Sequence, residues 1–181
     1  SFWAKTDSLT QSFPRLLEDV NTASSNGWAI SIPGSGDTNP NSVEAAIRAG
    51  GAAVHQKCTA NSAISSTSAW YYIVVNMTSA PSVSDIYVNG IDMSISDCTS
   101  GLVAGSQTNF QIGSRTDPTR YFDGKMDEVR ISSVARSANW VATEYNNQSS
   151  PNTFYSYGGQ DVESQPSTVP TVKVRGGVKF R

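Results

Sequence analysis

Short apolar segments separated by turn-forming residues recur through most of this chain and limit the folds open to it. They lie at residues 2–5, 13–20, 28–32, 52–57, 70–77, 86–89, 93–95 and 110–112. Short β-branched and aromatic segments at such spacing are typical of an all-β sandwich or barrel. Asn89 and Gly90 stand between two of them and predict a two-residue hairpin turn. Residues 71–75 are apolar at every position, which predicts a central strand covered on both faces.

One short helix is expected, at residues 137–147. Ser137 is a natural N-cap, because its hydroxyl can accept a hydrogen bond from a free amide of the first turn. The residues that follow at helical spacing give a mainly apolar stripe; they are Trp140, Val141, Glu144 and Tyr145. We therefore expect this helix to dock on the sandwich.

The size and charge of the chain restrict its partners. Its 181 residues fit one β domain over 1–159, a polar, proline-punctuated linker over 160–170, and a C-terminal strand or tail over 171–181. A net charge of -2 gives no field that would hold DNA or RNA. No stretch approaches the roughly 20 apolar residues of a membrane span. We expect neither a nucleic-acid partner nor membrane insertion.

Residues 171–181 alternate apolar and basic side chains around Gly176 and Gly177. One face of such a strand would be apolar and the other cationic. It is either an edge strand of this domain, protected from unwanted pairing by its Lys and Arg side chains, or a strand donated to a neighbouring subunit through main-chain hydrogen bonds.

The cysteines and the histidine are few. Cys58 and Cys98 either form a disulfide closing a loop of about 40 residues or stay as two buried thiols. One histidine and two distant cysteines do not make a zinc ligand set, so His55 is expected to be an ordinary strand residue.

Residues 121–131 have an irregular apolar spacing. Met126 and Val129 are three positions apart, whereas Val129 and Ile131 are two apart. If all three face the core, one extra residue must be accommodated at Asp127 and Glu128, which is a β-bulge. Because a bulge turns carboxylates and carbonyls away from the ladder, this spacing predicts a ligand platform.

The same stretch resembles the closing signature of laminin-G-like domains of the concanavalin A-like superfamily, in which an Asp-Glu-Val-Arg-Ile strand precedes a short helix. Residues 1–5, 70–75, 86–90 and 110–114 are similar, in order, to other strands of that family. The resemblance covers most of residues 1–158 and implies a two-sheet antiparallel jelly-roll sandwich. The strand that usually precedes residues 1–5 is missing, so one sheet is expected to lack an edge unless the gene product is longer or residues 171–181 fill the place.

The resemblance also implies an ion site. Related domains often hold Ca²⁺ near the sandwich rim with an Asp of the closing strand and loop carbonyls, and oxygen ligands suit that cation. Asp127 is the first candidate here. The alternative is that Asp127 pairs with Arg130 or Lys125 at the bulge.

Catalytic patterns are missing from the sequence, and we expect no enzyme. A retaining glucanase needs two carboxylates about 5 Å apart, often as Glu-x-Asp-x-Glu on one strand face. Asp127 and Glu128 are adjacent and would point to opposite faces of a regular strand. A Ser-His-Asp triad would have to use His55, and no Gly-x-Ser-x-Gly motif accompanies it.

Sugar binding needs exposed aromatic faces and planar polar side chains. The candidates lie in and beside loop 114–120, and they are Arg115, Asp117, Arg120 and Tyr121. The alternative is that Tyr121 packs at the rim and the charged groups are merely solvated. The four tryptophans, Trp3, Trp28, Trp70 and Trp140, are expected in the core.

Two functions fit these observations. The first is a non-catalytic recognition module of carbohydrate-binding or adhesion type, secreted or on a cell surface, with a glycan or surface protein as partner. The second is a structural assembly protein, such as a virion decoration or fibre component, in which residues 171–181 bind a neighbouring subunit. Fold alone does not decide between them.

Overall fold

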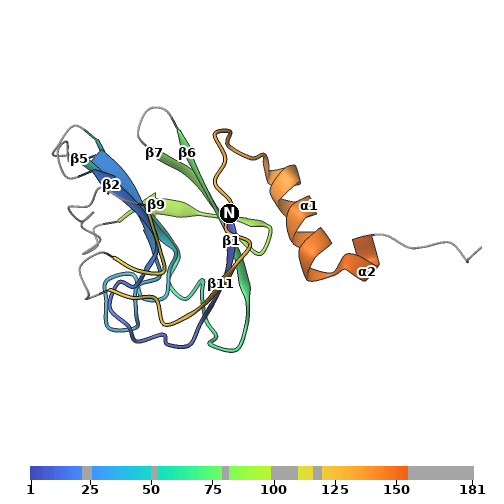
Figure 1. The fold of residues 1–181 in the computed structure, drawn as a ribbon, viewed down its shortest axis with the longest axis horizontal. Helices are drawn as coiled ribbons and strands as arrows, with labels where there is room; N and C mark the ends of the chain where they lie inside the picture. The colour runs from blue at the N-terminus through green and yellow to red at the C-terminus, as the bar shows by residue number, and fades with distance from the viewer. Residues whose placement is uncertain (22–25, 50–52, 79–81, 99–109, 116–119, 155–181) are drawn as a thin grey trace, which may run out of the picture.

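The computed structural model describes residues 1–21, 26–49, 53–78, 82–98, 110–115 and 120–154, which form two antiparallel sheets packed face to face (Figure 1). The strands are β1 (Phe2–Thr6), β2 (Arg15–Asn21), β3 (Asn26–Ser31), β4 (Glu44–Ala49), β5 (Ala53–Thr59), β6 (Tyr71–Thr78), β7 (Ser82–Val88), β8 (Ile91–Met93), β9 (Ile95–Asp97), β10 (Gln111–Ile112) and β11 (Gly124–Asp127). One sheet has the order β11-β1-β6-β7-β8 and the other β10-β2-β3-β4-β5-β9. The expected two-sheet sandwich is confirmed.

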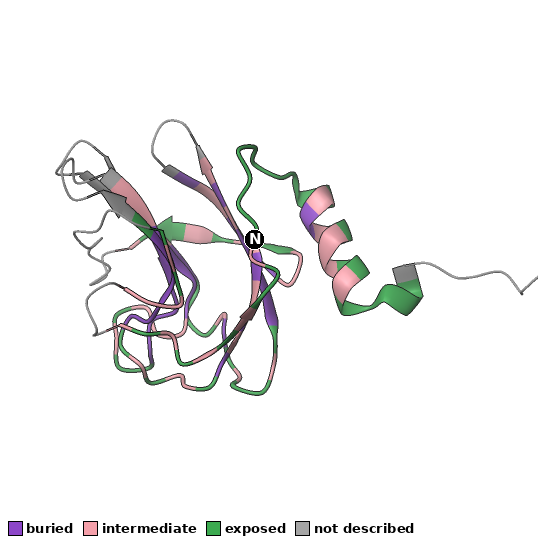
Figure 2. Cartoon of the chain, in the orientation of Figure 1, coloured by how far each residue is buried: buried purple, intermediate pink, exposed green. Residues whose placement is uncertain are grey.

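The core lies between the inner faces of the two sheets, where Figure 2 shows the buried segments. Phe2, Ile73 and Ile86 face inward from one sheet and meet Leu17 and Ile30 of the other. Strand β6 is apolar on both sides because its outer face is covered as well, as the sequence predicts.

That outer cover is the helix α1 (Ala138–Ser149), drawn in orange beside the five-stranded sheet in Figure 1. Its N-cap is Ser137, whose hydroxyl accepts from the Trp140 N–H at 3.3 Å. Val141 is fully buried against Tyr72 and Val74 of β6. The predicted helix is confirmed, and a short turn α2 (Pro151–Phe154) follows it. No described helix is long and apolar enough to span a membrane.

Two local predictions, for the turn and for His55, are also confirmed, and the structure has the disulfide alternative for the two cysteines. Asn89 and Gly90, with φ of 53° and 78°, make the tight turn between β7 and β8. Cys58 of β5 forms a disulfide with Cys98, with Cα atoms 5.9 Å apart. His55 is a strand residue of β5, opposite Ile47 of β4.

Strand β4 was not predicted from the sequence. Its residues Glu44, Ala45 and Ala46 have side chains common in helices, yet they lie between β3 and β5 and are buried. Pairing with β3 and β5 on both sides therefore overrides the helical preference of these residues. The predicted linker 160–170 and the predicted strand 171–181 lie outside the described residues.

Candidate functional site

The junction between β11 and α1 contains the predicted bulge. Regular pairing of β1 with β11 ends at Trp3 opposite Asp127. The next main-chain pair joins Ser1 and Arg130, in which each nitrogen donates to the carbonyl of the other at 2.8 Å. Glu128 and Val129 therefore stand opposite Phe2 alone, and Glu128 takes a left-handed φ of 51°. This two-against-one arrangement is a β-bulge.

The bulge changes which side chains face the core. Met126 and Val129 both pack against the core, as the spacing predicts. Ile131 does not, since it is 65% exposed. The prediction for Ile131 was wrong because Ser1 is the last main-chain partner of this segment, so the chain leaves the sheet after Arg130.

A pocket of about 590 Å³ opens where the bulge meets the second half of α1 and the residue before β6. Its walls combine three aromatic rings with polar side chains; they are Trp3, Trp70 and Tyr145, with Asp127, Glu128, Arg130, Gln148 and Ser149. Trp70 is 40% exposed. The expectation that the four tryptophans lie in the core was wrong for Trp70, which stands at the surface, whereas Trp3, Trp28 and Trp140 are partly buried and pack against the core clusters.

Trp3 and Tyr145, which line this pocket, form a cluster of aromatic rings with Tyr72. The Trp3 ring lies with its centroid 5.2 Å from that of Tyr72 and 5.8 Å from that of Tyr145. Burial raises the pKa of the Tyr72 hydroxyl, so this ring stays neutral across the physiological range. Aromatic contacts of this kind hold the rings in fixed orientations.

A chain of hydrogen bonds ties the pocket walls together. The Trp3 Nε1–H donates to Gln148 Oε1, and the Gln148 amide donates to Glu144 Oε1 at 2.7 Å. Arg130 forms ion pairs with both Glu144 of α1 and Glu128 of the bulge. Strand β1, helix α1 and the bulge therefore position one another, and Arg130 pairs with these two glutamates instead of with Asp127.

Asp127 lies at the pocket rim and is exposed. Its Oδ1 accepts from the Glu128 N–H at 2.8 Å, and among the described residues it has no ion pair. Calcium needs six to eight oxygen ligands. Within the described segments Asp127 belongs to no group of three ligand side chains. The one such group contains Glu44 with Cys58 and Cys98, whose sulfurs are joined to each other. The side chains around Asp127 do not by themselves fit a calcium site, and Ca²⁺ binding there stays a prediction.

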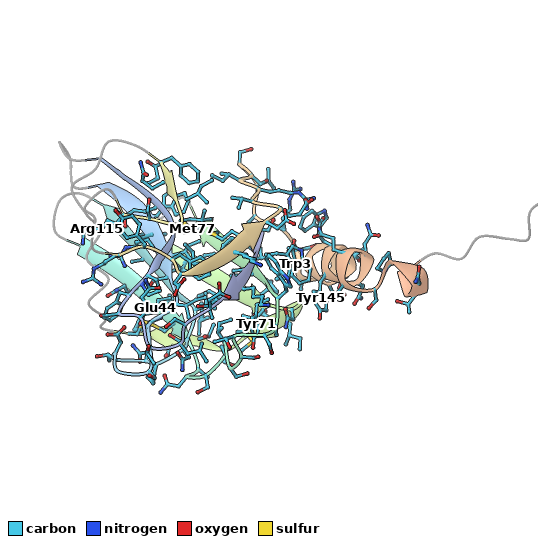
Figure 3. All side chains as sticks on the ribbon, turned by 60° about the horizontal axis from the view of Figure 1, so that its bottom comes forward. Trp3, Glu44, Tyr71, Met77, Arg115 and Tyr145 are labelled. Atoms are coloured by element: carbon cyan, nitrogen blue, oxygen red, sulfur yellow. A yellow bond between two sulfur atoms is a disulfide. The ribbon has the colours of Figure 1, made fainter. Side chains whose placement is uncertain are left out.

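The other predicted ligand residues lie elsewhere. Arg115 is on the opposite side of the molecule from Trp3 and Tyr145 (Figure 3). The Arg120 guanidinium stacks on the Phe13 ring, 5.3 Å from its centroid. Tyr121 is 52% exposed, and Asp117 lies outside the described residues. None of the described three lines the pocket beside Asp127.

A buried ion pair lies near Arg115 and Arg120. Arg15 Nε donates to Glu18 Oε2 at 2.7 Å, and both side chains are fully inaccessible to solvent. Burial lowers the pKa of Arg15, the contact with Glu18 opposes this effect, and the charges of Arg120 and Arg115 add to the lowering. This pair anchors the start of β2.

The turn beneath the pocket gives a testable prediction. A Cβ placed on Gly90 would lie 3.0 Å from Cδ1 of Tyr145, at a backbone φ that side chains disfavour. Gly90→Ala should therefore lower the free energy of unfolding by about 1–2 kcal/mol, measured by urea denaturation. Gly36→Ala is the matched control, since nothing lies within 4 Å of its Cβ position. Equal stability of the two variants would contradict this account of the turn.

Two packed antiparallel sheets with a helix over one outer face define a jelly-roll sandwich domain. A laminin-G model of the concanavalin A-like lectin/glucanases superfamily matches residues 1–142, and the chain belongs to that superfamily. The resemblance inferred from the sequence is confirmed. A search of curated proteins finds no match to this chain.

Proposed function

We propose that this domain is a non-catalytic carbohydrate-binding module and that the pocket beside Trp70 is its sugar site. The observation that carries the proposal is the exposed Trp70 ring at the edge of a pocket lined by hydrogen-bonding side chains. The apolar face of a pyranose ring stacks on an aromatic ring while its hydroxyls take hydrogen bonds. Membership of a superfamily that includes lectins supports the same conclusion.

The polar groups of the pocket suit sugar hydroxyls. Asp127 has no ion pair among the described residues and can accept further hydrogen bonds beside the one from the Glu128 N–H, and Ser149 and Gln148 add a hydroxyl and an amide. The Gln148 side chain is held in place, because it is hydrogen-bonded to Trp3 and to Glu144 at the same time. A site whose side chains are already positioned loses less conformational entropy when a ligand binds.

The charge of the pocket favours neutral sugars over acidic ones. Asp127 and Glu128 line the pocket, and Glu144 is bonded to the lining residues Gln148 and Arg130, which gives three negative charges. Arg130 carries one positive charge that is shared by Glu128 and Glu144. An anionic glycan would meet the remaining negative charge at short range, which costs free energy. We therefore propose a neutral oligosaccharide as the ligand.

The arrangement of the carboxylates supports the non-catalytic part of the proposal. Hydrolysis with retention needs a nucleophile and an acid on the two sides of the scissile bond. Glu128 and Glu144 are both engaged by Arg130, which leaves Asp127 as the single unpaired carboxylate among the described lining residues. One carboxylate cannot fill both roles.

The disulfide supports a proposal about location. Disulfides persist in oxidising surroundings such as the secretory pathway and the cell exterior. The bond between Cys58 and Cys98 therefore fits a domain that works in such surroundings.

The test is a glycan array probed with the whole chain, followed by calorimetry with the best neutral oligosaccharide. Trp70→Ala should weaken binding at least tenfold, about 1.4 kcal/mol, because the stacking surface is lost. Tyr121→Ala is the matched control, since it removes an exposed aromatic ring beside loop 114–120, where the sequence predicts sugar binding. Thermal melting of both variants checks that they are folded.

Two results would overturn the proposal. If Tyr121→Ala loses binding and Trp70→Ala does not, the sugar site lies at the loop before Tyr121. If prolonged incubation of the bound oligosaccharide with the protein releases shorter sugars, the domain is an enzyme.

A further inference from the structure

The Gln148 side chain presents a hydrogen-bond donor to the pocket beside Trp70. Its Oε1 accepts from the Trp3 Nε1–H, and its Nε2 donates one N–H to Glu144 Oε1 at 2.7 Å. A primary amide has two N–H groups, and the second one has no hydrogen bond within the described segments. The two existing bonds fix the orientation of the amide, because turning it over would break both. A ligand in this pocket therefore meets an N–H of Gln148.

Asp127 presents the opposite chemistry at the same wall of the pocket. At neutral pH a carboxylate only accepts hydrogen bonds. Its Oδ1 accepts from the Glu128 N–H at 2.8 Å, and its other oxygen is left for a ligand. Asp127 lies directly opposite Trp3 in the pairing of β11 with β1, and Gln148 is bonded to the Trp3 ring nitrogen. Trp3 therefore brings an acceptor and a donor to the same part of the pocket.

Aromatic rings supply an apolar surface beside these two polar groups. The ring centroids of Trp3 and Tyr145 are 5.8 Å apart, and Figure 3 shows both residues where α1 meets the sheet. Trp70 stands at the edge of the same pocket. One acceptor, one donor and an aromatic surface together fit a ligand group that has one donor, one acceptor and an apolar end.

The acetamido group of an N-acetylated amino sugar has this combination. Its N–H donates, its C=O accepts and its methyl group is apolar. In a planar trans amide the N–H and the C=O point in opposite directions, so the group can bond Asp127 on one side and Gln148 on the other. A hydroxyl at the same carbon has one oxygen for both bonds and no methyl group. The acetamido group is also neutral, in agreement with the charge of the pocket.

We infer that this pocket selects oligosaccharides that contain N-acetylated amino sugars. Asp127 accepts from the acetamido N–H, Gln148 donates to its C=O, and the rings of Trp3 and Tyr145 contact its methyl group. The inference rests on the proposed sugar site and adds the class of sugar. Stacking of the pyranose ring on Trp70 is common to all neutral sugars, so the acetamido contacts are the ones that distinguish among them.

Calorimetry with the whole chain tests the inference. The β-1,4-linked oligomers of N-acetylglucosamine and of glucose, at equal length, differ only at C2, and the acetylated one should bind at least tenfold more tightly. In Asp127→Asn an amide can still accept from the Glu128 N–H, but an NH₂ group replaces the second acceptor, so this preference should fall below about threefold. Asp7→Asn is the matched control, because it makes the same charge change at an exposed position outside the pocket. Thermal melting checks that both variants are folded.

Several outcomes would overturn the inference. Equal affinity for the two oligomers, with binding still lost in Trp70→Ala, would keep the sugar site and remove its selectivity. Tighter binding of the same oligomer without its acetyl groups, which is cationic, would show that the pocket selects charge. A preference that Asp127→Asn leaves unchanged would place the acetamido group elsewhere. If no neutral oligosaccharide binds at all, the proposed function fails together with the inference.

Discussion

Glu18→Gln is expected to lower the free energy of unfolding by about 3–5 kcal/mol. The Glu18 carboxylate is the buried partner of the buried Arg15 guanidinium. Removing its charge leaves Arg15 in a place where burial and two further arginines already disfavour the charged form. Urea denaturation followed by tryptophan fluorescence measures the loss.

The double variant Arg15→Met/Glu18→Leu separates the charge effect from packing. Both charges are removed at once, so the desolvation penalty disappears along with the attraction, and stability should return close to that of the unmodified chain. Asp97→Asn is the surface control, because Asp97 pairs with Lys57 at 2.7 Å while exposed, and it should change stability by less than about 1 kcal/mol. A loss for Glu18→Gln as small as for Asp97→Asn would contradict the prediction.

Removal of the disulfide is expected to have an effect of similar size. Cys58→Ala/Cys98→Ala opens a loop of 40 residues, and the greater freedom of the unfolded chain should lower the free energy of unfolding by about 4 kcal/mol. The urea dependence should also become steeper, because the unfolded chain exposes more surface. Denaturation of the unmodified chain with a reductant should reproduce the effect. If reduction leaves the midpoint unchanged, the bond does not restrain the unfolded state.

Most of the sandwich could be predicted because its strands carry their own signals. Residues 71–75 are apolar at every position, and both faces of β6 are in fact covered. Asn89 and Gly90 require the positive φ angles that they adopt. Strand β4 could not be predicted in this way, since Ala45 and Ala46 carry no β signal and are held by their neighbours on both sides.

The candidate site was only partly predictable. The bulge followed from the spacing of Met126 and Val129, which is a local property, and Asp127 was a candidate because of the resemblance to laminin-G-like domains. Trp70 did not, because a tryptophan at the start of a strand gives no sign of whether it faces the core or solvent. The meeting of Trp3, Trp70 and Tyr145 depends on how α1 docks, and a single sequence contains no direct signal for that contact.

The position of β1 between β6 and β11 has a consequence for the order of folding. Strands β2, β3, β4 and β5 are neighbours in both sequence and sheet, so their pairing needs only short loops to close. By contrast, Lys5 of β1 pairs with Lys125 of β11, 120 positions further along the chain. At ribosomal rates of 5–20 residues per second, synthesis of that interval takes roughly 6–24 s. During this interval β1 lacks its β11 neighbour and can pair only with β6. The five-stranded sheet is therefore completed last.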